Sequence, residues 1–287
     1  MMLCYDGKLS LYCFVTASVI AGLPEILFRL EFDNYMSYLQ NMWVIHILLY
    51  GFLNLLLALA FRGFAYRVAV RATFLGYVFA VGILIFFCSS ASWQMFGIYI
   101  SVLAFFHYSE FLAIAWTNPD TVSIESFILN HSLAYGIAAC SSWLEFIVER
   151  YFFPTIKEAS SISYFGLVLC LGGEVLRKMA IFTAKRNFSH IVQNKKAENH
   201  ELVTHGVYGF CRHPSYVGWF YWSIGTQLIL QNPFCFVAYA ITSWRFFHER
   251  VLIEELTLLN FFRGQYVDYQ KKVGTGLPFI VGYKVEL

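Results

Sequence analysis

Long apolar runs place the strongest limit on what this 287-residue chain can fold into. Charged residues and turn signals separate eight such runs, near 9–29, 41–61, 68–88, 92–116, 126–148, 162–184, 213–230 and 233–259. About 20 consecutive apolar residues are enough for a helix to cross the hydrocarbon core of a bilayer. A helix satisfies its own backbone groups there, whereas an open strand does not. We therefore predict an all-α, polytopic integral membrane protein with about eight transmembrane helices.

The composition argues against other fold classes. Hydrophobic residues make up 59% of the chain and charged residues only 13%, whereas soluble domains carry about 25% charged residues. So few charges cannot coat the surface of a soluble two-domain enzyme, and so apolar a chain is not a disordered one. The seven cysteines are odd in number, include no C-x-x-C pair and lie mostly in apolar runs. We interpret them as small apolar residues inside helices, not as disulfide partners or metal ligands.

The last two apolar runs are separated only by Gln231-Asn232-Pro233, which predicts a tight helical hairpin. The chain shows no repeat, linker or low-complexity stretch. We divide it into residues 1–160, with about five predicted transmembrane helices, and residues 161–287, a membrane-embedded core that carries the polar segments.

The basic residues are distributed unevenly across the predicted spans. Seventeen of the 20 Lys and Arg residues fall on one side, and only Arg29, Arg150 and Lys157 fall on the other. Loops rich in Lys and Arg stay on the cytosolic side of a membrane, so both termini are predicted to be cytosolic. The long polar segments 185–212 and 260–287 lie on that same side, where we expect the functional site.

The segment from Leu202 to Gly218 differs most from a plain membrane loop. Gly206 and Gly209 permit tight backbone turns, and Pro214 is suited to the first turn of a helix. A helix that starts there offers unpaired N–H groups and a positive dipole end to a carboxylate or another anion. Side-chain donors beside it are His213, Ser215 and Tyr216. An ordinary loop with interfacial aromatic residues is the alternative interpretation.

Charged residues lie at the end of the eighth apolar run. A charge in an apolar helix is energetically costly unless it is paired, hydrated or used in function. Arg250 and Glu254 are four residues apart and share a helical face, so they can simply pair with each other. Alternatively, Arg250 binds the anion of a substrate while Glu254 or Glu255 contacts a second ligand. The residues alone leave both interpretations open.

Other kinds of site find little support. The spacing of His200, His205, Cys211 and His213 matches no zinc-ligand pattern, so we predict no metal site. The chain lacks G-x-G-x-x-G and G-x-S-x-G motifs, which disfavours a Rossmann turn and a Ser-His-Asp hydrolase. It also lacks the clustered basic residues of a nucleic-acid-binding protein, so no nucleic-acid partner is expected.

Several motifs together resemble one enzyme family. They are the run Arg212-His213-Pro214-Ser215-Tyr216-Val217-Gly218, the Gln231-Asn232-Pro233 turn, Arg250, the Glu254-Glu255 pair and the run Thr275-Gly276-Leu277-Pro278-Phe279-Ile280. With Gln193 ahead of them, they closely resemble the eukaryotic protein-S-isoprenylcysteine carboxyl methyltransferases. The first run also occurs in phospholipid methyltransferases and, in related form, in some sterol reductases, so alone it identifies a superfamily. The resemblance covers roughly the last 120 residues, and the first 160 are similar only in length and hydropathy.

The resemblance implies transfer of a methyl group from S-adenosylmethionine to the C-terminal α-carboxylate of a prenylated cysteine on CaaX-processed proteins. It implies a multi-pass protein of the endoplasmic reticulum membrane that takes farnesyl or geranylgeranyl chains from the bilayer and binds its cofactor on the cytosolic face. Arg250 would bind the substrate carboxylate and act in catalysis. The residues that would contact S-adenosylmethionine, by matching position, are Gln193, His200, Glu201, Leu202, Val203, Tyr208, His213, Pro214, Ser215, Tyr216 and Glu254.

Two positions depart from the family pattern. Val251-Leu252-Ile253 stand where some relatives have acidic residues, and Gly274 stands where a proline often precedes Thr-Gly-Leu-Pro. Neither change removes a proposed contact, but the first leaves the role of Glu255 open. One alternative is a phospholipid N-methyltransferase, whose amine acceptor has no carboxylate for Arg250 and must lose protons to a base. The other is a membrane transporter or lipid-binding protein.

Overall fold

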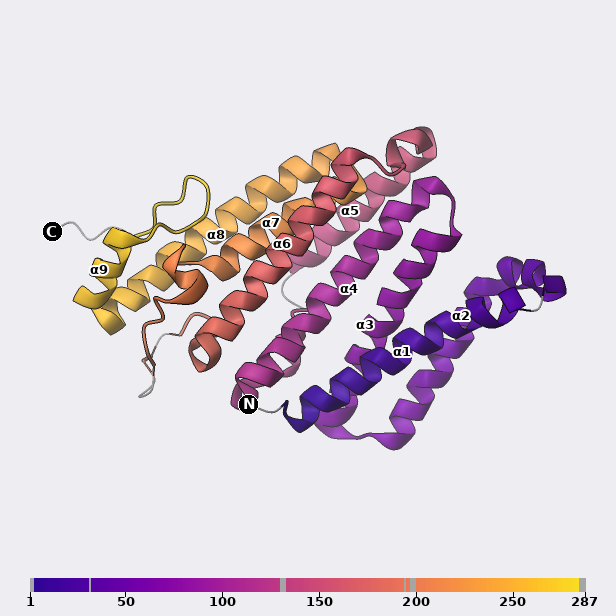
Figure 1. Ribbon diagram of the computed structural model, residues 1–287, viewed down its shortest axis with the longest axis horizontal. Coiled ribbons are helices and arrows are strands. Elements are labelled where there is room, and N and C mark those ends of the chain that lie inside the picture. Colours follow the sequence, from indigo (N-terminus) through magenta and orange to yellow (C-terminus); the bar gives the residue numbers. More distant parts are fainter. Residues whose placement is uncertain (1–2, 31, 130–132, 194, 197–199, 284–287) are drawn as a thin grey trace. The chain divides into compact units, whose positions relative to one another are not determined.

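The computed structural model of the chain describes residues 3–30, 32–129, 133–193, 195–196 and 200–283, with the backbone alone for 28–30 and 32–41. Throughout these ranges the regular elements are helices, and no strand is found. The predicted all-α fold is therefore confirmed (Figure 1). The helices pack into two groups, which we describe separately.

The first group contains the N-terminal helices α1 (Tyr5–Leu30), α2 (Phe32–Ala60), α3 (Gly63–Cys88) and α4 (Ala91–Thr117). The short 3₁₀ elements η1 (Pro119–Thr121), η2 (Ile124–Phe127) and η3 (Pro154–Lys157) complete it. Helix α3 packs against both α1 and α4. A Cβ on Gly76 would collide with the backbone of Phe14 in α1, and one on Gly82 would lie 2.6 Å from the Gly97 carbonyl oxygen in α4. Such small residues let membrane helices approach at backbone distance.

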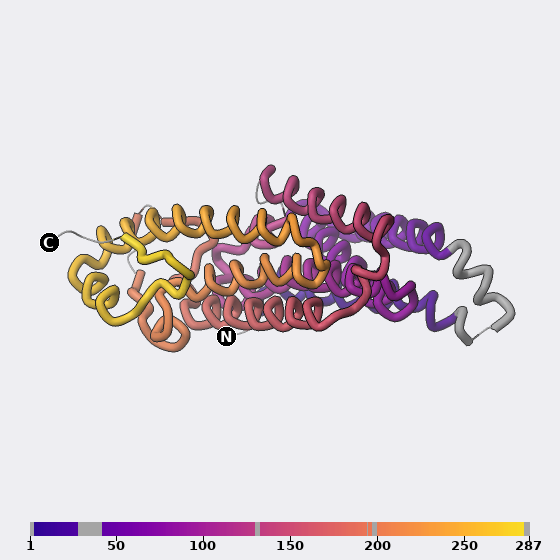
Figure 2. The backbone as a smooth tube through the Cα atoms, turned by 90° about the horizontal axis from the view of Figure 1, so that it is seen from above, coloured from indigo at the N-terminus to yellow at the C-terminus, as the bar shows by residue number. Residues whose placement is uncertain are grey.

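The second group contains α5 (Leu133–Phe152), α6 (Ser161–Ala184), η4 (Lys185–Asn187), η5 (Gly206–Gly209), α7 (Pro214–Leu230), α8 (Pro233–Phe262) and α9 (Gly264–Lys272). Figures 1 and 2 show α6, α7 and α8 running alongside one another, with α7 between the other two. The Cβ that Gly173 lacks would overlap the Gly218 carbonyl, and a Cβ on Gly218 would lie 2.9 Å from the Arg177 amide. This close approach of α6 to α7 brings Arg177 to the first turn of α7.

The turn between α7 and α8 is held by side chains of α5. Gln231 adopts a left-handed conformation with φ of 53°, and Pro233 opens α8. The Glu145 carboxylate accepts hydrogen bonds from the amides of Phe234 at 2.8 Å and Cys235 at 2.7 Å. It therefore satisfies two of the amides that the first turn of a helix leaves unpaired. Glu145, a charged residue of the fifth predicted apolar run, thus caps the start of α8 from the neighbouring helix α5.

Most of the predicted apolar runs match observed helices. The eight runs correspond to α1–α8, but α5 begins at Leu133 and not near 126, because η1 and η2 occupy residues 119–127. Helix α9 was not predicted; it follows Arg263, whose φ of 46° ends α8. By packing, α5 belongs with the C-terminal helices, across the predicted division after residue 160, which stays a prediction.

Within the described part of the chain, five segments are long and apolar enough to cross a membrane. They are Tyr5–Leu27, Met42–Ala60, Gly63–Cys88, Ala91–Thr117 and Pro154–Asn187. The chain is thus a multi-pass membrane protein, whereas the number of eight spans and the transmembrane hairpin stay predictions.

The cap from Glu145 predicts a graded loss of stability. Replacing Glu145 with Ala removes both acceptors and should lower the free energy of unfolding by about 1–2 kcal/mol. Glu145→Gln keeps one acceptor oxygen and should lose less. Thermal unfolding in detergent measures both variants, and an Ala variant as stable as the natural chain would contradict the capping role.

Candidate functional site

The polar residues singled out in the sequence gather in the second group, where α7 begins and α8 ends. Pro214 is the first residue of α7 and His213 precedes it as the N-cap. Both are buried, as is Ser215. Proline has no N–H of its own, and the amides of Tyr216 and Val217 donate to the His213 carbonyl, so among the described residues the Ser215 amide is the one left unpaired at this helix end. The expected helix start at Pro214 is therefore confirmed.

Tyr216 joins the two charged residues at the end of α8. Its hydroxyl donates a short hydrogen bond to Oε2 of Glu254 and accepts one from Nε of Arg250 at 3.2 Å. Arg250 also donates from Nη2 to the carbonyl of His190 at 2.7 Å. Among the described residues, the third nitrogen, Nη1, has no hydrogen-bond partner. A shared phenol thus bridges Arg250 and Glu254, and one edge of the guanidinium is left for a ligand.

His213 packs against Tyr216 of this group. Its ring stacks parallel to that of Tyr216, with centroids 5.5 Å apart and an interplanar angle of 3°. Its Nε2 lies 3.0 Å from Oε1 of Glu255, and its Nδ1 lies 4.0 Å from Oε2 of Glu254. The imidazole therefore stands between a buried carboxylate and a carboxylate of the site, and it supports the position of Tyr216.

Glu255 is the centre of a buried ion cluster. Its side chain is fully buried, and Oε1 accepts from Nε of Arg212 at 2.8 Å as well as facing His213. Oε2 accepts from Nε2 of Gln270 at 3.0 Å and from the amide of Tyr283 at 2.8 Å. The role that the sequence left open is thus structural: Glu255 connects the start of α7, α9 and the C-terminal segment.

Arg212 completes the cluster with bonds to the main chain. It donates from Nη2 to the carbonyl of Val281 at 2.9 Å and from Nη1 to the carbonyl of Val273. Its amide donates to the carbonyl of Gly274 at 2.8 Å. Arg212 stands in a sequence motif, but the sequence did not indicate its role, because its partners lie 43 to 69 residues away along the chain.

Arg177 of α6 is a second buried cation that sequence reasoning missed. Only 2% of it is exposed. Its Nη1 donates to the Ser215 hydroxyl at 2.7 Å, and its guanidinium lies 4.7 Å from the centroid of the Trp219 ring. A cation over an aromatic face is stabilised by the ring quadrupole. The Ser215 hydroxyl, predicted to contact the cofactor, thus already accepts a hydrogen bond from within the protein.

The loop before α7 lies against the α8–α9 corner. His200 packs edge-on against the rings of Phe261 and Phe262, at 5.7 and 5.4 Å. Burial, and then the Lys196 ammonium, lower the pKa of the His200 imidazole, while Glu254 opposes this shift. The His200 imidazole is therefore neutral near pH 7 and able to accept a hydrogen bond from a ligand. In the same loop, Leu202 packs against the buried Leu259, Phe262, Tyr266 and Tyr269.

The remaining predicted contacts lie in the same loop. The Tyr208 carbonyl accepts a hydrogen bond from the Tyr269 hydroxyl at 2.5 Å, and burial raises the pKa of the Tyr208 phenol well above its usual value. The Gln193 side chain is exposed and donates to Ser189 at 2.8 Å. The Glu201 amide donates to Asn187 at 3.0 Å. Val203 is half-buried. These hydrogen bonds hold Gln193 and Glu201 within their own segment.

The four residues weighed as zinc ligands do not form a common centre. His213 faces Glu255, whereas His200 packs against aromatic rings. Within the described ranges, no group of three or more His, Cys, Asp and Glu side chains has the arrangement of a metal site.

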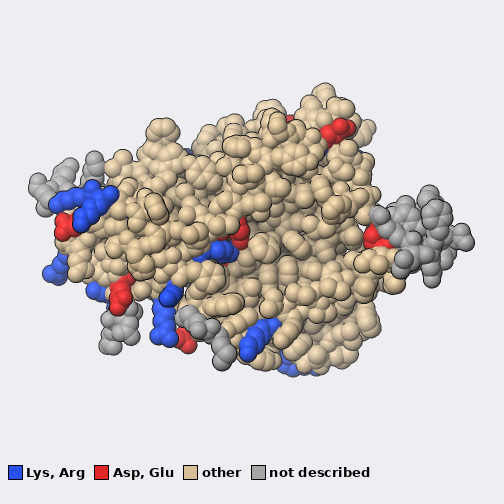
Figure 3. Space-filling model, viewed as in Figure 1, with Lys and Arg blue, Asp and Glu red and all other residues tan. Residues whose placement is uncertain are grey.

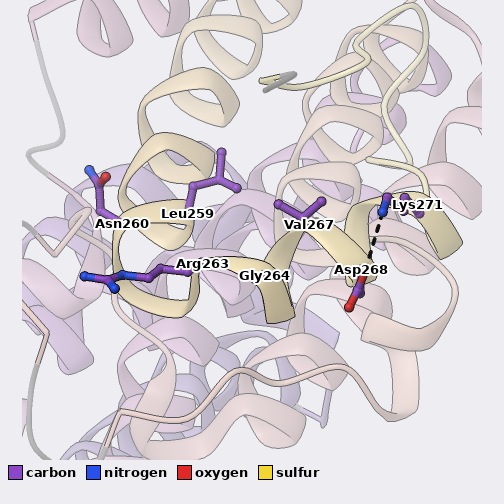
Figure 4. Close-up of a pocket in the computed structure, with 7 residues that line it drawn as sticks. All are labelled: Leu259, Asn260, Arg263, Gly264, Val267, Asp268 and Lys271. Carbon is purple, nitrogen blue, oxygen red and sulfur yellow. Dashed lines mark ion pairs between the residues drawn. The ribbon is translucent and has the colours of Figure 1, made fainter. Parts of the chain in front are cut away.

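A separate hollow of about 500 Å³ opens at the turn between α8 and α9 (Figure 4). Its lining residues are Leu259, Asn260, Arg263, Gly264, Val267, Asp268 and Lys271. Asp268 and Lys271 pair at 3.6 Å, but both side chains are mostly exposed, and exposed ion pairs contribute little. None of the predicted site residues lines this hollow.

Fold and site together define a multi-pass helical membrane protein with a charged, partly buried site at one end of its C-terminal helices. The profile of the isoprenylcysteine carboxyl methyltransferase family matches residues 166–260, which include α7 and most of α6 and α8. Together with relatives that match nearly the whole chain, this shows that the chain belongs to the family.

Individual relatives support the assignment over a much longer stretch. The protein-S-isoprenylcysteine O-methyltransferase of Tribolium castaneum is 51% identical over 287 residues, covering 99% of this chain and 100% of the relative. That of Homo sapiens is 50% identical over 282 residues, covering 98% and 96%.

A solved structure agrees with these relatives. That of the eukaryotic intramembrane Ras methyltransferase, isoprenylcysteine carboxyl methyltransferase, is 50% identical, has a TM-score of 0.90, and covers 98% of this chain and 100% of that one. The similarity is thus wider than the motifs indicated: it includes the first 160 residues as well as the last 120.

The buried Arg212–Glu255 pair predicts strong coupling in stability. Removing one partner leaves the other charge buried, so Arg212→Ala or Glu255→Ala should each lower the free energy of unfolding by about 3–5 kcal/mol. The double variant should lose clearly less than the sum, because neither charge is then left alone. Unfolding in detergent measures all three, and simple additivity would contradict the coupling.

Proposed function

We propose that this methyltransferase moves a methyl group from S-adenosylmethionine to the C-terminal α-carboxylate of a prenylated cysteine on CaaX-processed proteins. The products are a methyl ester and S-adenosylhomocysteine. The observation that carries this proposal is the Arg250–Tyr216–Glu254 group, which offers a guanidinium edge and a carboxylate on either side of one phenol. Membership of the family supports the reaction type.

The residues of the site fit the proposed cofactor. When bound, S-adenosylmethionine supplies an electrophilic methyl group on a positively charged sulfur. The first turn of α7 offers the Ser215 amide and the positive end of the helix dipole to its carboxylate. Glu254 is placed to accept hydrogen bonds from its ammonium or ribose hydroxyl groups, and the neutral His200 adds an acceptor beside the rings of α8.

The proposed reaction requires no proton transfer by a residue of the protein. A C-terminal carboxylate is ionised at neutral pH, because its pKa is about 3.3–3.7. It is therefore already the nucleophile, and the chain needs no general base. Bound S-adenosylmethionine would supply the methyl group to this carboxylate, and the residues of the site would need only to bind and orient the two reactants. Catalysis then depends on holding the reactants in line, which is worth about 7–11 kcal/mol in well-oriented reactions.

Arg250 has the position required to hold the substrate carboxylate. Taking a carboxylate out of water without a partner is costly, and a guanidinium compensates for this with directed hydrogen bonds. Tyr216 and the His190 carbonyl fix two of its nitrogens, so the free edge is oriented before the substrate binds. Such preorientation lowers the entropy lost on binding.

Aromatic side chains next to Arg250 suit the prenyl chain. Phe246 and Phe247 precede it by about one turn of α8, and Trp219 of α7 lies 6.4 and 6.0 Å from their rings. A farnesyl or geranylgeranyl chain partitions into lipid at about 0.8 kcal/mol per CH₂. This favours a lateral opening between helices that leads from the bilayer to the site.

The placement in the cell follows the same reasoning. Seventeen of 20 basic residues fall on one side of eight predicted spans, which favours cytosolic termini and a cytosolic cofactor site. We propose the endoplasmic reticulum membrane as the location, as the resemblance to the family implies.

The proposed reaction is tested with purified protein and labelled S-adenosylmethionine. We expect base-labile methyl ester on a farnesylcysteine analogue and none of the label on phosphatidylethanolamine. Label on the phospholipid alone would instead identify a phospholipid N-methyltransferase. Cofactor binding with no transfer to either acceptor would contradict both enzymatic assignments.

Arg250 has its own test. Arg250→Ala should lower kcat/KM for the farnesylcysteine analogue about 100-fold, equivalent to about 3 kcal/mol, because the desolvated carboxylate loses its partner. The exposed Arg245 on the same helix is the matched control, and Arg245→Ala should change kcat/KM little. Near-normal activity of the Arg250 variant would overturn the assigned role.

A further inference from the structure

Ser189 lies just beyond the membrane-crossing segment that contains α6. That segment ends at Asn187, and Ser189 follows two residues later in irregular chain. It is exposed, as are Lys185 and Arg186 before it. The backbone of the preceding Phe188 is extended, with φ of −82° and ψ of 133°. A hydroxyl in exposed, extended chain outside the membrane is open to an enzyme that modifies it.

Two cations precede this serine. Arg186 stands three residues and Lys185 four residues before Ser189. Neither forms an ion pair with another residue in the described part of the chain. Figure 3 shows basic side chains gathered at this end of α6. Protein kinases select their substrates by charge patterns around the acceptor hydroxyl, so an arginine-directed serine kinase is the enzyme that fits this segment.

Exposure distinguishes Ser189 from the other residue with this spacing. Ser215 is the one further serine or threonine that follows an arginine, Arg212, by three residues. It is buried in the first turn of α7, and its hydroxyl accepts a hydrogen bond from Arg177 at 2.7 Å. Ser215 therefore cannot enter the active site of a kinase while the chain is folded.

The Ser189 hydroxyl organises the chain that follows it. It donates to the Ile191 carbonyl at 2.7 Å, and it accepts from the Ile191 amide at 3.1 Å and from Nε2 of Gln193 at 2.8 Å. A serine oxygen bonded to phosphorus has no hydrogen to donate, so phosphorylation removes the bond to the Ile191 carbonyl. It also adds a charge of about −1.5 to −2 and three acceptor oxygens. The phosphate therefore requires other donors.

Arg250 is a donor that the structure places beside this segment. Its Nη2 binds the carbonyl of His190, the residue after Ser189, at 2.7 Å. Its Nη1 has no hydrogen-bond partner among the described residues. Neighbouring Cα atoms are about 3.8 Å apart, so a phosphate on Ser189 stands one residue from a contact of the guanidinium. Guanidinium–phosphate pairs are short and charge-assisted.

We propose that Ser189 is a phosphorylation site and that its phosphate binds Arg250. In the transfer, the serine oxygen forms a bond to the γ-phosphorus of ATP, the bond from that phosphorus to the bridging oxygen breaks, and ADP leaves with the electron pair. The hydroxyl proton passes to the catalytic aspartate of the kinase. The uneven distribution of basic residues favours the cytosolic side for this segment, where ATP is available.

Other charged groups influence where the phosphate binds. Arg186 offers a second guanidinium, but it is exposed, and exposed ion pairs contribute little. Arg250 is half-buried, so a pair with it is screened less by salt. The Glu254 carboxylate repels a phosphate, although its Oε2 already accepts the hydrogen bond of Tyr216. The balance favours Arg250.

The consequence for activity rests on the proposed function. There the free edge of Arg250 binds the substrate carboxylate. A phosphate on that edge occupies the same donor, so phosphorylation weakens binding of the methyl acceptor. The modification is thus an inhibitory switch built from one charge-for-charge exchange.

The site itself is tested by labelling the purified chain in proteoliposomes. The probe is a serine kinase selected on peptides with arginine three residues before serine, supplied with Mg²⁺ and ATP. Peptide mapping should find phosphate on Ser189 and none on Ser215. Arg186→Ala should slow the labelling about tenfold, because the kinase loses an ion pair, and Lys195→Ala, the exposed control after the serine, should not. A chain left unlabelled by a kinase that phosphorylates the peptide of residues 183–192 would overturn the site.

The contact with Arg250 is tested without methyl transfer. Phosphoserine is incorporated at position 189 by codon reassignment, and ³¹P NMR follows its second ionisation, which has a pKa of about 6 in free phosphoserine. A nearby guanidinium lowers this pKa. Arg250→Ala should therefore raise it again, and by more than Arg186→Ala does. The same phosphate pKa with and without Arg250 would overturn the contact.

Kinetics then test the inhibition. With phosphoserine at position 189, the KM for the farnesylcysteine analogue should rise about tenfold or more, because the carboxylate loses its charged partner. Ser189→Ala removes the same hydrogen bonds without adding charge and should leave KM within about threefold. An unchanged KM with phosphoserine would overturn the switch. If the unmodified chain transfers no methyl group to the analogue, the proposed function fails, whereas the labelling and NMR results still decide the site and its contact.

Discussion

The buried ion pair of Arg212 and Glu255 is the interaction on which the C-terminal half depends. The carboxylate accepts hydrogen bonds from residues at the start of α7, in α9 and in the C-terminal segment, residues 273–283. The guanidinium binds the Val273 and Val281 carbonyls within that segment. A buried charge is tolerable only with its partners present, so these segments are ordered together. The site is built on this base: Tyr216 lies one turn after Arg212, and Glu254 is the direct neighbour of Glu255.

Helix α8 shows how one element serves both packing and chemistry. Val251, Glu255 and Leu259, spaced by four, face the interior and are buried. Arg250 and Glu254, also spaced by four but one position earlier, reach Tyr216 on the adjacent face. Because a helix rotates by about 100° per residue, adjacent glutamates in the sequence have different roles. The pair Glu254-Glu255 is therefore one carboxylate that binds the Tyr216 hydroxyl and one buried structural carboxylate.

The helices could be predicted from the sequence because apolar runs of membrane length leave few alternatives. The start of α5 was misplaced because the apolar residues Phe127, Ile128 and Leu129 extend the apolar pattern ahead of the helix, although Phe127 ends a 3₁₀ turn. The motifs predicted that Arg250, Glu254 and Tyr216 belong to one site. They did not indicate that the Tyr216 hydroxyl bridges the two charged side chains.

What the sequence could not show was which residues meet across long separations. Arg177 lies in an apolar run, 38 residues before the serine that accepts its hydrogen bond. The partners of Glu255 lie between 15 and 43 residues away. No local sequence pattern predicts such pairs. They depend on the close packing of α6 against α7 and on the contact of the C-terminal segment, residues 273–283, with α8.

The cap that Glu145 provides has a consequence for which substitutions this chain can accept. The carboxylate binds main-chain amides of α8 and not the side chains of Phe234 and Cys235. The attachment of α5 to the α7–α8 turn is therefore indifferent to which side chains these two positions carry. Phe234 is 78% exposed, so a change of its side chain should leave this attachment intact. Proline at either position would remove its hydrogen bond to Glu145, because proline has no amide hydrogen to donate.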